Sequence, residues 1–338
     1  MNFAARPWLS AILLAVLAFL PSSANAGMTP EEVKKFEVFR TLAEKGDRVA
    51  QCNLGNCYIN GNGVTKDEVE AVKWYRKAAE QGQANAQYEL GLCYSNGEGV
   101  AKDMIEAAKW CRKAADQGYR VAQYNLGNCY FNGEGLAKDM IEAVKWYRKA
   151  ADQGYADAQY NLGVCYRKGT GVAKDDIEAV KWYPKAADKG HADAQYNLSG
   201  CYFNGYGVAK DMVEAVKWLR KSADQGYADA YFDLGECYRN GYGVTKEMVE
   251  AVKWLRKSAN LGYVDAQFRL GFCYANGLGV EKNMVEAYAY FKLAGITDEV
   301  ARNNLAILEK GLSPDARIRG QQRAKEMQKE IEAKRAGK

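Results

Sequence analysis

The feature that most constrains the fold of this chain is a repeat with a period of 36 residues. Six tryptophans recur at this spacing without an insertion: Trp74, Trp110, Trp146, Trp182, Trp218 and Trp254. Seven cysteines keep the same period: Cys57, Cys93, Cys129, Cys165, Cys201, Cys237 and Cys273. A period in this range indicates stacked supersecondary units that bury a core only by contact with their neighbours. Seven copies fill residues 48–295.

The first half of each copy has the pattern of a helix that ends at a glycine. In one copy, Ala122, Leu126, Cys129 and Tyr130 are spaced i, i+4, i+7 and i+8, so they share one helix face. Gly133 follows the last apolar residue. Glycine accepts the left-handed conformation that closes a helix, so we expect the helix to end there.

The second half of each copy has the pattern of an amphipathic helix. The segment 139–153, "DMIEAVKWYRKAADQ", opens with Asp139 and Glu142, whose spacing suits the cap and third position of a helix. Ala143 and Trp146 begin an apolar face, and the lysines mark the solvated one. Each copy is therefore predicted to be a helix–turn–helix unit.

These residues also carry a resemblance to a known family. The frame LGxxYxxGxGVxxDxxxAxxWYRKAAxxGxxxAQ resembles the Sel1-like repeat, a relative of the tetratricopeptide repeat. The resemblance implies an all-α fold, a right-handed α/α superhelical solenoid of about seven 36-residue helix-turn-helix repeats with polar capping helices. It also implies that the first helices line a concave face, and that the protein works as a protein–protein adaptor without chemistry of its own.

Both flanks of the array are predicted to cap it. Residues 29–46 have the pattern of a lone second helix, so they form an N-terminal half-repeat. Residues 298–311 resemble a degenerate first helix, and residues 313–338 form a basic C-terminal capping helix and tail. The sparse apolar positions of that helix are Ile318, Met327 and Ile331. A solenoid needs such polar caps to shield its last core face.

The first residues predict export. Arg6 precedes an apolar run from Leu9 to Leu20, and Ala24-Asn25-Ala26 has the small residues of a cleavage site. The apolar run is too short to span a bilayer comfortably. We therefore expect residues 1–26 to be a signal peptide and the mature protein to be periplasmic or extracellular.

The charge distribution argues against nucleic acid as a partner. The formal net charge is +5, and residues 314–338 hold eight Lys/Arg against four Asp/Glu, so most of the excess lies in the tail. Binding to phosphates needs a clustered basic face, and the repeats supply none. The tail could touch an anionic membrane surface, but we do not expect it to.

The cysteines are interpreted mainly as buried packing residues, because free cysteine behaves as a small hydrophobe. Cys111 stands where four of the other six copies have an aromatic residue, 18 residues from both Cys93 and Cys129. An exported protein permits one disulfide there, between Cys111 and Cys93 or Cys129. We expect no catalytic residue, no cofactor and no metal site, because the chain has a single histidine, His191, and no CxxC spacing.

Comparison of the copies with one another indicates where a partner would bind. Two positions of the first helix vary between copies and lie on the same helix face, at i and i+3. Column A is Asn53, Glu89, Asn125, Asn161, Asn197, Asp233 and Arg269. Column B is Asn56, Leu92, Asn128, Val164, Gly200, Glu236 and Phe272. Apart from Gly200, which has no side chain, these residues are the candidate groove for another protein or an extended peptide. The asparagines can form hydrogen bonds with the backbone of such a peptide. A solvated face without a ligand would show the same columns.

Three functions stay open from the sequence. The first is a non-enzymatic adaptor or scaffold that binds a protein or peptide on the concave face. The second is a cell-envelope beta-lactam-binding hydrolase of the cysteine-rich Sel1-like type, although those members carry paired cysteines in each unit and this chain carries mainly one. The third is a peptidoglycan-binding protein that uses its tyrosines and asparagines together.

Overall fold

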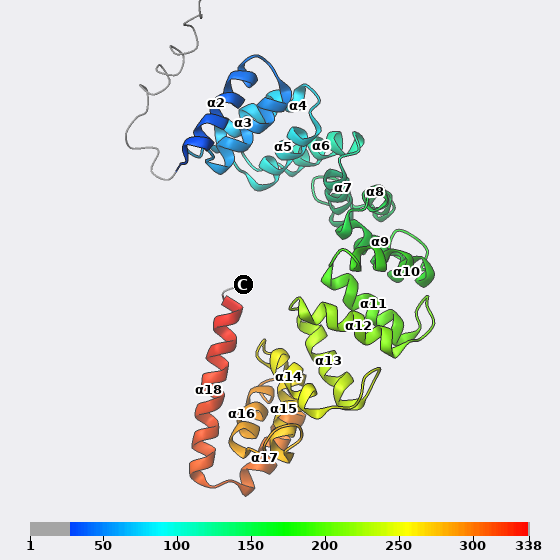
Figure 1. The fold of residues 1–338 in the computed structure, drawn as a ribbon, viewed down its shortest axis with the longest axis vertical. Coiled ribbons are helices and arrows are strands. Elements are labelled where there is room, and N and C mark those ends of the chain that lie inside the picture. Colours follow the sequence, from blue (N-terminus) through cyan, green and yellow to red (C-terminus); the bar gives the residue numbers. More distant parts are fainter. Residues whose placement is uncertain (1–27, 337–338) are drawn as a thin grey trace, which may run out of the picture. The chain divides into compact units, whose positions relative to one another are not determined.

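The structure is a computed structural model that describes residues 28–336, and this part of the chain is entirely helical, without a β-strand (Figure 1). The predicted signal peptide, residues 1–26, lies outside the described residues. The helices are α2 Pro30–Glu44, α3 Arg48–Asn60, α4 Glu68–Glu80, α5 Ala84–Asn96, α6 Met104–Asp116, α7 Arg120–Asn132, α8 Met140–Asp152, α9 Ala156–Lys168, α10 Asp176–Ala187, α11 Ala192–Asn204, α12 Met212–Asp224, α13 Ala228–Asn240, α14 Met248–Ala259, α15 Val264–Asn276, α16 Met284–Ala294, α17 Glu299–Gly311 and α18 Pro314–Ala336.

The helices alternate as the sequence predicts. The odd-numbered helices α3 to α15 are the first helices of the seven repeats, and the even-numbered helices α4 to α16 are the second helices. A first helix packs on the second helix of its own repeat, as α5 does on α6, and a second helix packs on the next first helix, as α6 does on α7. The prediction of an all-α solenoid of about seven helix-turn-helix repeats is confirmed.

The chain divides into two compact units, residues 28–149 and residues 150–336, and helix α8 contains the boundary. Each unit is an array of helix pairs, so the features below are described within one unit or the other.

The helix ends follow the predicted capping chemistry. Oδ1 of Asp139 accepts hydrogen bonds from the backbone N–H groups of Ile141 at 2.9 Å and Glu142 at 3.0 Å, which satisfies free amides at the start of α8. At the end of α7, Gly133 has a φ of +83° and donates its N–H to the carbonyl of Cys129. The left-handed φ explains why glycine stands at this position in every repeat.

A buried glutamine joins consecutive helices in most repeats. In the first unit, Nε2 of Gln87 donates to the carbonyl oxygen of Ala79 at 3.0 Å, and Oε1 of Gln87 accepts from Nε2 of Gln117 at 2.7 Å. The carbonyl of Ala79 lies in the last turn of α4, where helical carbonyls lack partners within their own helix. This carbonyl also accepts the N–H of Gly82 at 3.0 Å, so Gln87 adds a second donor to it and links three successive helices.

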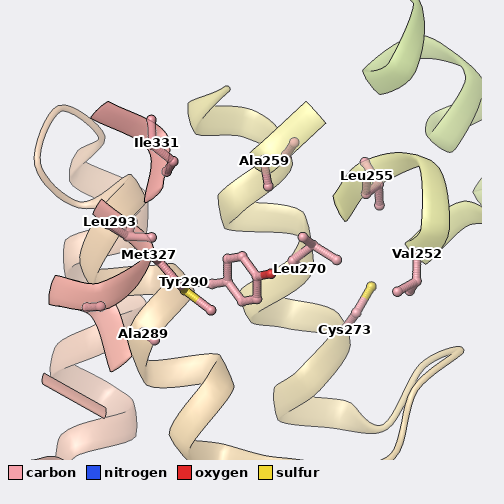
Figure 2. Packing of buried hydrophobic residues seen from close by; sticks show 12 residues of the cluster. Val252, Leu255, Ala259, Leu270, Cys273, Ala289, Tyr290, Leu293, Met327 and Ile331 are labelled. Carbon is pink, nitrogen blue, oxygen red and sulfur yellow. The ribbon is translucent and has the colours of Figure 1, made fainter. Parts of the chain in front are cut away.

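Helix α18 covers the last core of the second unit. Its side chains Met327 and Ile331 are buried, and they belong to the cluster that contains Tyr290 and Leu293 of α16 (Figure 2). Nη2 of Arg335 also donates to the carbonyl oxygen of Leu261 at 3.3 Å, which fastens the end of α18 to the turn after α14. The predicted capping segment thus forms a helix that shields apolar side chains.

One predicted apolar position of α18 does not take part in this core. Ile318 is 62% exposed, whereas Met327 is 6% exposed. At 100° per residue, nine residues place Ile318 on the opposite side of the helix from Met327. The buried stripe runs instead through Gly320, Ala324, Met327 and Ile331.

Candidate binding surface

Column A lies along the first helices, and most of its side chains are half-buried rather than freely exposed. In the first unit, Nδ2 of Asn125 on α7 donates to the hydroxyl of Tyr88 on α5 at 3.0 Å. In the second unit, the hydroxyl of Tyr196 on α11 donates to Oδ2 of Asp233 on α13 at 2.8 Å. These bonds cross from one first helix to the next, so column A joins neighbouring repeats.

The same pattern recurs at Asn197, whose Nδ2 donates to the hydroxyl of Tyr160 at 3.4 Å. Sequence reasoning missed that the hydroxyls of these tyrosines bond to column A. A signal was present, because a tyrosine or phenylalanine directly precedes column A in six of its seven copies, from Tyr88 to Phe268.

Burial shifts the titration of the acidic members of column A. Burial raises the pKa of the Glu89 carboxyl. Burial also raises the pKa of the Asp233 carboxyl, and the hydrogen bond from Tyr196 partly opposes that rise by favouring the charged form. The pKa of the Tyr88 hydroxyl is raised to about 12, first by burial and then by the nearby Glu89. Partial burial is therefore the common cause of these shifts, and it occurs both in binding sites and where helices pack together.

Column B is coupled to the second helix of the same repeat. The hydroxyl of Tyr75 on α4 donates to Oδ1 of Asn56 at 2.7 Å, and the hydroxyl of Tyr147 on α8 donates to Oδ1 of Asn128 at 2.7 Å. Where the second helix has no tyrosine at this position, column B has a different residue, such as Leu92 beside Cys111. The variation of column B thus partly follows packing within the repeat.

The C-terminal end of both columns carries charge and one exposed aromatic side chain. Glu236 accepts from Nε and Nη2 of Arg239 at 2.8 and 2.6 Å, and Nε of Arg269 lies 3.5 Å from its Oε1. Phe272 on α15 is 48% exposed. A large apolar side chain that faces solvent on a predicted binding face is available to a partner.

A cavity of about 280 Å³ opens between α5 and α7 in the first unit. Three predicted groove residues line it: Leu92, Asn125 and Asn128. Cys111 and Cys129 also line it, and sequence reasoning did not place them there. The available signal was the replacement of an aromatic residue by Cys111.

A larger cavity, of about 550 Å³, opens between α11 and α13 in the second unit. Its lining includes the predicted residues Asn197, Asp233 and Glu236. Arg167 and Tyr242 line it as well, although neither was predicted for the groove. In each unit, therefore, the predicted columns meet at a recess between two consecutive first helices.

All nine cysteines are free thiols in the structure, and all except Cys129 are buried. The disulfide predicted for Cys111 with Cys93 or Cys129 is absent from the structure, in which Sγ of Cys111 donates to the carbonyl oxygen of Ala122 at 3.2 Å. Burial is the main cause that raises the pKa of Cys93 and Cys111 to about 12, and that of Cys129 to about 11. The thiolate forms of these three residues are therefore scarce at neutral pH.

His191 occupies a helix cap. Its Nδ1 accepts from the N–H of Ala194 at 3.3 Å, and its ring stacks on Tyr160 at 4.6 Å between centroids. Among residues 28–336, no three or more His, Cys, Asp or Glu side chains come together in a way that could hold a metal ion. Within the same residues, no helix is both long and apolar enough to cross a membrane.

Comparison with known proteins agrees with this architecture. The Sel1 repeat matches seven consecutive segments: residues 48–83, 84–119, 120–155, 156–191, 192–227, 228–263 and 264–295. None of the curated proteins matches the chain.

Two solved structures are similar over most of their length. One is a Sel1 repeat protein from Oxalobacter formigenes, with 36% sequence identity and a TM-score of 0.65, over 81% of this chain and 80% of that one. The other is a protective antigen present in uropathogenic Escherichia coli strains that displays an SLR fold, with 32% identity and a TM-score of 0.60, over 89% of this chain and 72% of that one. Because the repeats also match without a break from residue 48 to residue 295, the chain belongs to the Sel1 repeat family.

Proposed function

We propose that this protein is a non-enzymatic adaptor that binds another protein, through an extended peptide, on the face formed by its first helices. Sel1 repeat proteins are commonly protein-interaction scaffolds. The observation that carries the proposal for this chain is the position of the recesses. In each unit a cavity lies between consecutive first helices and is lined by the columns that vary between repeats.

The chemistry of these recesses suits a peptide. Asn125, Asn128 and Asn197 each use one amide atom to bond a tyrosine hydroxyl. The other amide atom of each can form a hydrogen bond with a peptide backbone. Apolar side chains such as Leu92 and Phe203 lie beside them. A lining that contains both amide and apolar groups suits a ligand whose backbone and side chains must both be accommodated.

The state of the thiols supports a role in packing rather than catalysis. A cysteine nucleophile requires a thiolate, which usually needs a neighbouring base or cation. Here burial raises the pKa of Cys129, the most accessible thiol, to about 11. The cysteines that recur every 36 residues are therefore best understood as part of the core.

Export is part of the same proposal. The pattern of residues 1–26 is that of a signal peptide, so the adaptor would act in the periplasm or outside the cell. Fractionation of cells that express the tagged chain should recover a mature form that begins near Gly27 outside the cytoplasm. Recovery of the full-length form in the cytoplasm would contradict this location.

The test of the adaptor function is crosslinking of the tagged full chain in its native cells, followed by mass spectrometry. The variant Asn161→Arg/Phe272→Arg places two cations on the first-helix face of the second unit. The matched control is Val213→Arg/Val249→Arg, which changes two side chains, 54% and 52% exposed, on the second helices α12 and α14. Neither pair removes a buried core side chain.

We expect partners crosslinked to the wild type to be lost from the first pair and kept by the control. We expect this loss because an arginine that is buried at the interface without a partner charge weakens binding. Partners that are retained by both variants would place binding elsewhere on the chain. A wild type without any specific crosslinked partner would refute the adaptor function.

A further inference from the structure

A large side chain of the second helix normally packs against a glycine in the middle of the first helix. A Cβ added to the glycine would lie only 2.5 to 2.8 Å from the nearest atom of that side chain. Five repeats show this pair: Gly55 with Tyr75, Gly127 with Tyr147, Gly163 with Tyr183, Gly235 with Leu255, and Gly271 with Phe291. In four of the five, the side chain is an aromatic ring.

The repeat of residues 84–119 lacks this ring. A Cβ added to Gly91 would first meet the carbonyl oxygen of Ala107 at 3.1 Å, and Cys111 contributes only its backbone nitrogen, at 3.4 Å. The Cys111 side chain is much smaller than a ring, and its Sγ is turned toward the carbonyl of Ala122. The space that a ring occupies in other repeats is therefore open here, and it forms the cavity of about 280 Å³.

The lining of this cavity has two kinds of surface. Leu92, Met104 and Cys111 form an apolar part, whereas Asn125 and Asn128 of α7 form a polar part. Nδ2 of Asn125 is used by Tyr88 and Oδ1 of Asn128 by Tyr147. The other amide atom of each asparagine, an acceptor on Asn125 and a donor on Asn128, has no partner among the contacts of the described residues. A planar ring with a polar edge would use both surfaces.

The volume suffices for a ring. An engineered apolar cavity of about 150 Å³ already binds benzene. The cavity beside Cys111 is larger, at about 280 Å³, and it is open to solvent on the face of the predicted groove. A side chain from another molecule can therefore enter where a side chain of the same chain is missing.

We propose that this cavity, between α5 and α7, binds an aromatic side chain of the peptide partner, which takes the place of the ring that Cys111 does not supply. This inference rests on the proposed function, because it names the anchor of the bound peptide. Burial of an aromatic anchor in a preformed pocket is how a small number of residues dominates the affinity of many interfaces.

The test uses Cys129, which lines the cavity and is the one thiol of the nine that is not buried. The alkylation rate of Cys129 in the full-length wild type is measured by mass spectrometry at alkaline pH. The additions are p-cresol, which is the tyrosine side chain alone, N-acetyltyrosinamide, and N-acetylleucinamide as the aliphatic comparison. We expect both aromatic compounds to slow alkylation several-fold and the leucine compound to leave the rate nearly unchanged.

Two variants locate the effect. Cys111→Phe supplies the missing ring beside Leu92, as Phe291 does beside Phe272 in the last repeat. It should abolish protection of Cys129 by p-cresol. Leu219→Phe changes the same helix position in the second unit and should leave the protection intact. If Cys111→Phe does not fold, the comparison of aromatic with aliphatic compounds on the wild type tests the proposal without it.

Several results would overturn the proposal. These are an unchanged Cys129 rate in p-cresol, equal protection by the leucine compound, and protection that persists in folded Cys111→Phe. Failure of this anchor is separate from failure of the adaptor function. If partners are crosslinked but aromatic compounds do not protect Cys129, only the aromatic anchor is refuted. If aromatic compounds protect Cys129 but no partner is crosslinked, the ring does not come from a bound peptide.

Discussion

At the scale of single residues, the glycine in the middle of each first helix is explained by close packing rather than by backbone conformation. Gly127 lies in α7 without a positive φ, and a Cβ there would come 2.6 Å from the ring of Tyr147. A glycine within a helix costs about 1 kcal/mol relative to alanine. The ring contact offsets this cost, since burial of a tyrosine side chain stabilises the fold by more than that amount.

The substitutions Gly127→Ala and Gly91→Ala form a matched pair. At Gly127 the added methyl group meets a buried ring, so we expect a loss of roughly 1–3 kcal/mol of stability, as for other overpacked sites. At Gly91 the ring is missing, so the loss should be offset by the gain in helix propensity, about 1 kcal/mol. Urea unfolding of both variants measures the difference. Equal destabilisation would contradict the open space beside Cys111.

The raised pKa of Asp233 leads to a prediction about how stability depends on pH. Burial raises its pKa from 3.8, so the folded chain holds this proton more tightly than the unfolded chain does. The contribution of Asp233 to stability therefore falls as the pH rises from near 3.8 through the raised pKa of the folded state. Asp233→Asn, which copies Asn197, should stabilise the protein at neutral pH and lose that advantage in acid.

Unfolding by urea at neutral and acidic pH checks this prediction. The control is Asp265→Asn, because Asp265 is an exposed carboxylate on the next first helix. An advantage for Asp233→Asn that does not change with pH would show that the effect comes from the altered hydrogen bond with Tyr196 and not from ionisation.

At the scale of helices, α10 differs from the other second helices because Pro184 lies inside it. The helix nevertheless runs from Asp176 to Ala187. Five of the other six repeats have an arginine at this position, and the last has Lys292. The arginine can reach a tyrosine 18 residues later: Nη2 of Arg76 lies 2.6 Å from the hydroxyl of Tyr94, and Nη2 of Arg256 lies 2.8 Å from that of Tyr274. The repeat with Pro184 thus lacks both a backbone donor and an inter-helix contact.

The substitution Pro184→Arg should stabilise the second unit. Proline within a helix costs about 3 kcal/mol, so we expect a gain of roughly 1–3 kcal/mol and slower amide hydrogen exchange over residues 185–191. Pro184→Ala separates the two contributions, because alanine restores the backbone donor without the contact to Tyr202. Exchange over residues 185–191 of the wild type that is already as slow as in the other repeats would contradict a weakened helix.

At the scale of the whole molecule, an array of repeats exposes a core face wherever it ends. Helix α18 covers that face in the second unit through Met327 and Ile331, which contact the cluster of Tyr290 and Leu293. The basic tail is therefore first of all a structural cap. Two of its arginines also bond to the second unit, since Nε of Arg323 lies 3.0 Å from Oε1 of Glu286 on α16 and Arg335 donates to the carbonyl oxygen of Leu261.

Because α18 buries Ile331 but leaves Ile318 exposed, we predict that substitutions at these two positions change stability by different amounts. Ile331→Asp buries a charge in the last core and should cost about 3 kcal/mol or more, with local exposure of α16. Ile318→Asp changes a side chain that is 62% exposed and should cost less than about 0.5 kcal/mol. Thermal unfolding together with hydrogen exchange over residues 284–294 distinguishes them. Similar behaviour of the two variants would contradict the assigned face of α18.

The sequence alone determined the repeat, the two helices of each copy and the residues that begin and end them, because periodicity and capping depend on neighbours within one helix. The tertiary structure decided what the columns do. The position of Asn125 and Asp233 varies between repeats as a surface position would, yet each of these residues bonds to a tyrosine of the preceding first helix. The cavity beside Cys111 likewise depends on atoms from α5, α6 and α7 at once. Such contacts are set by distances between helices, which no pattern along a single helix contains.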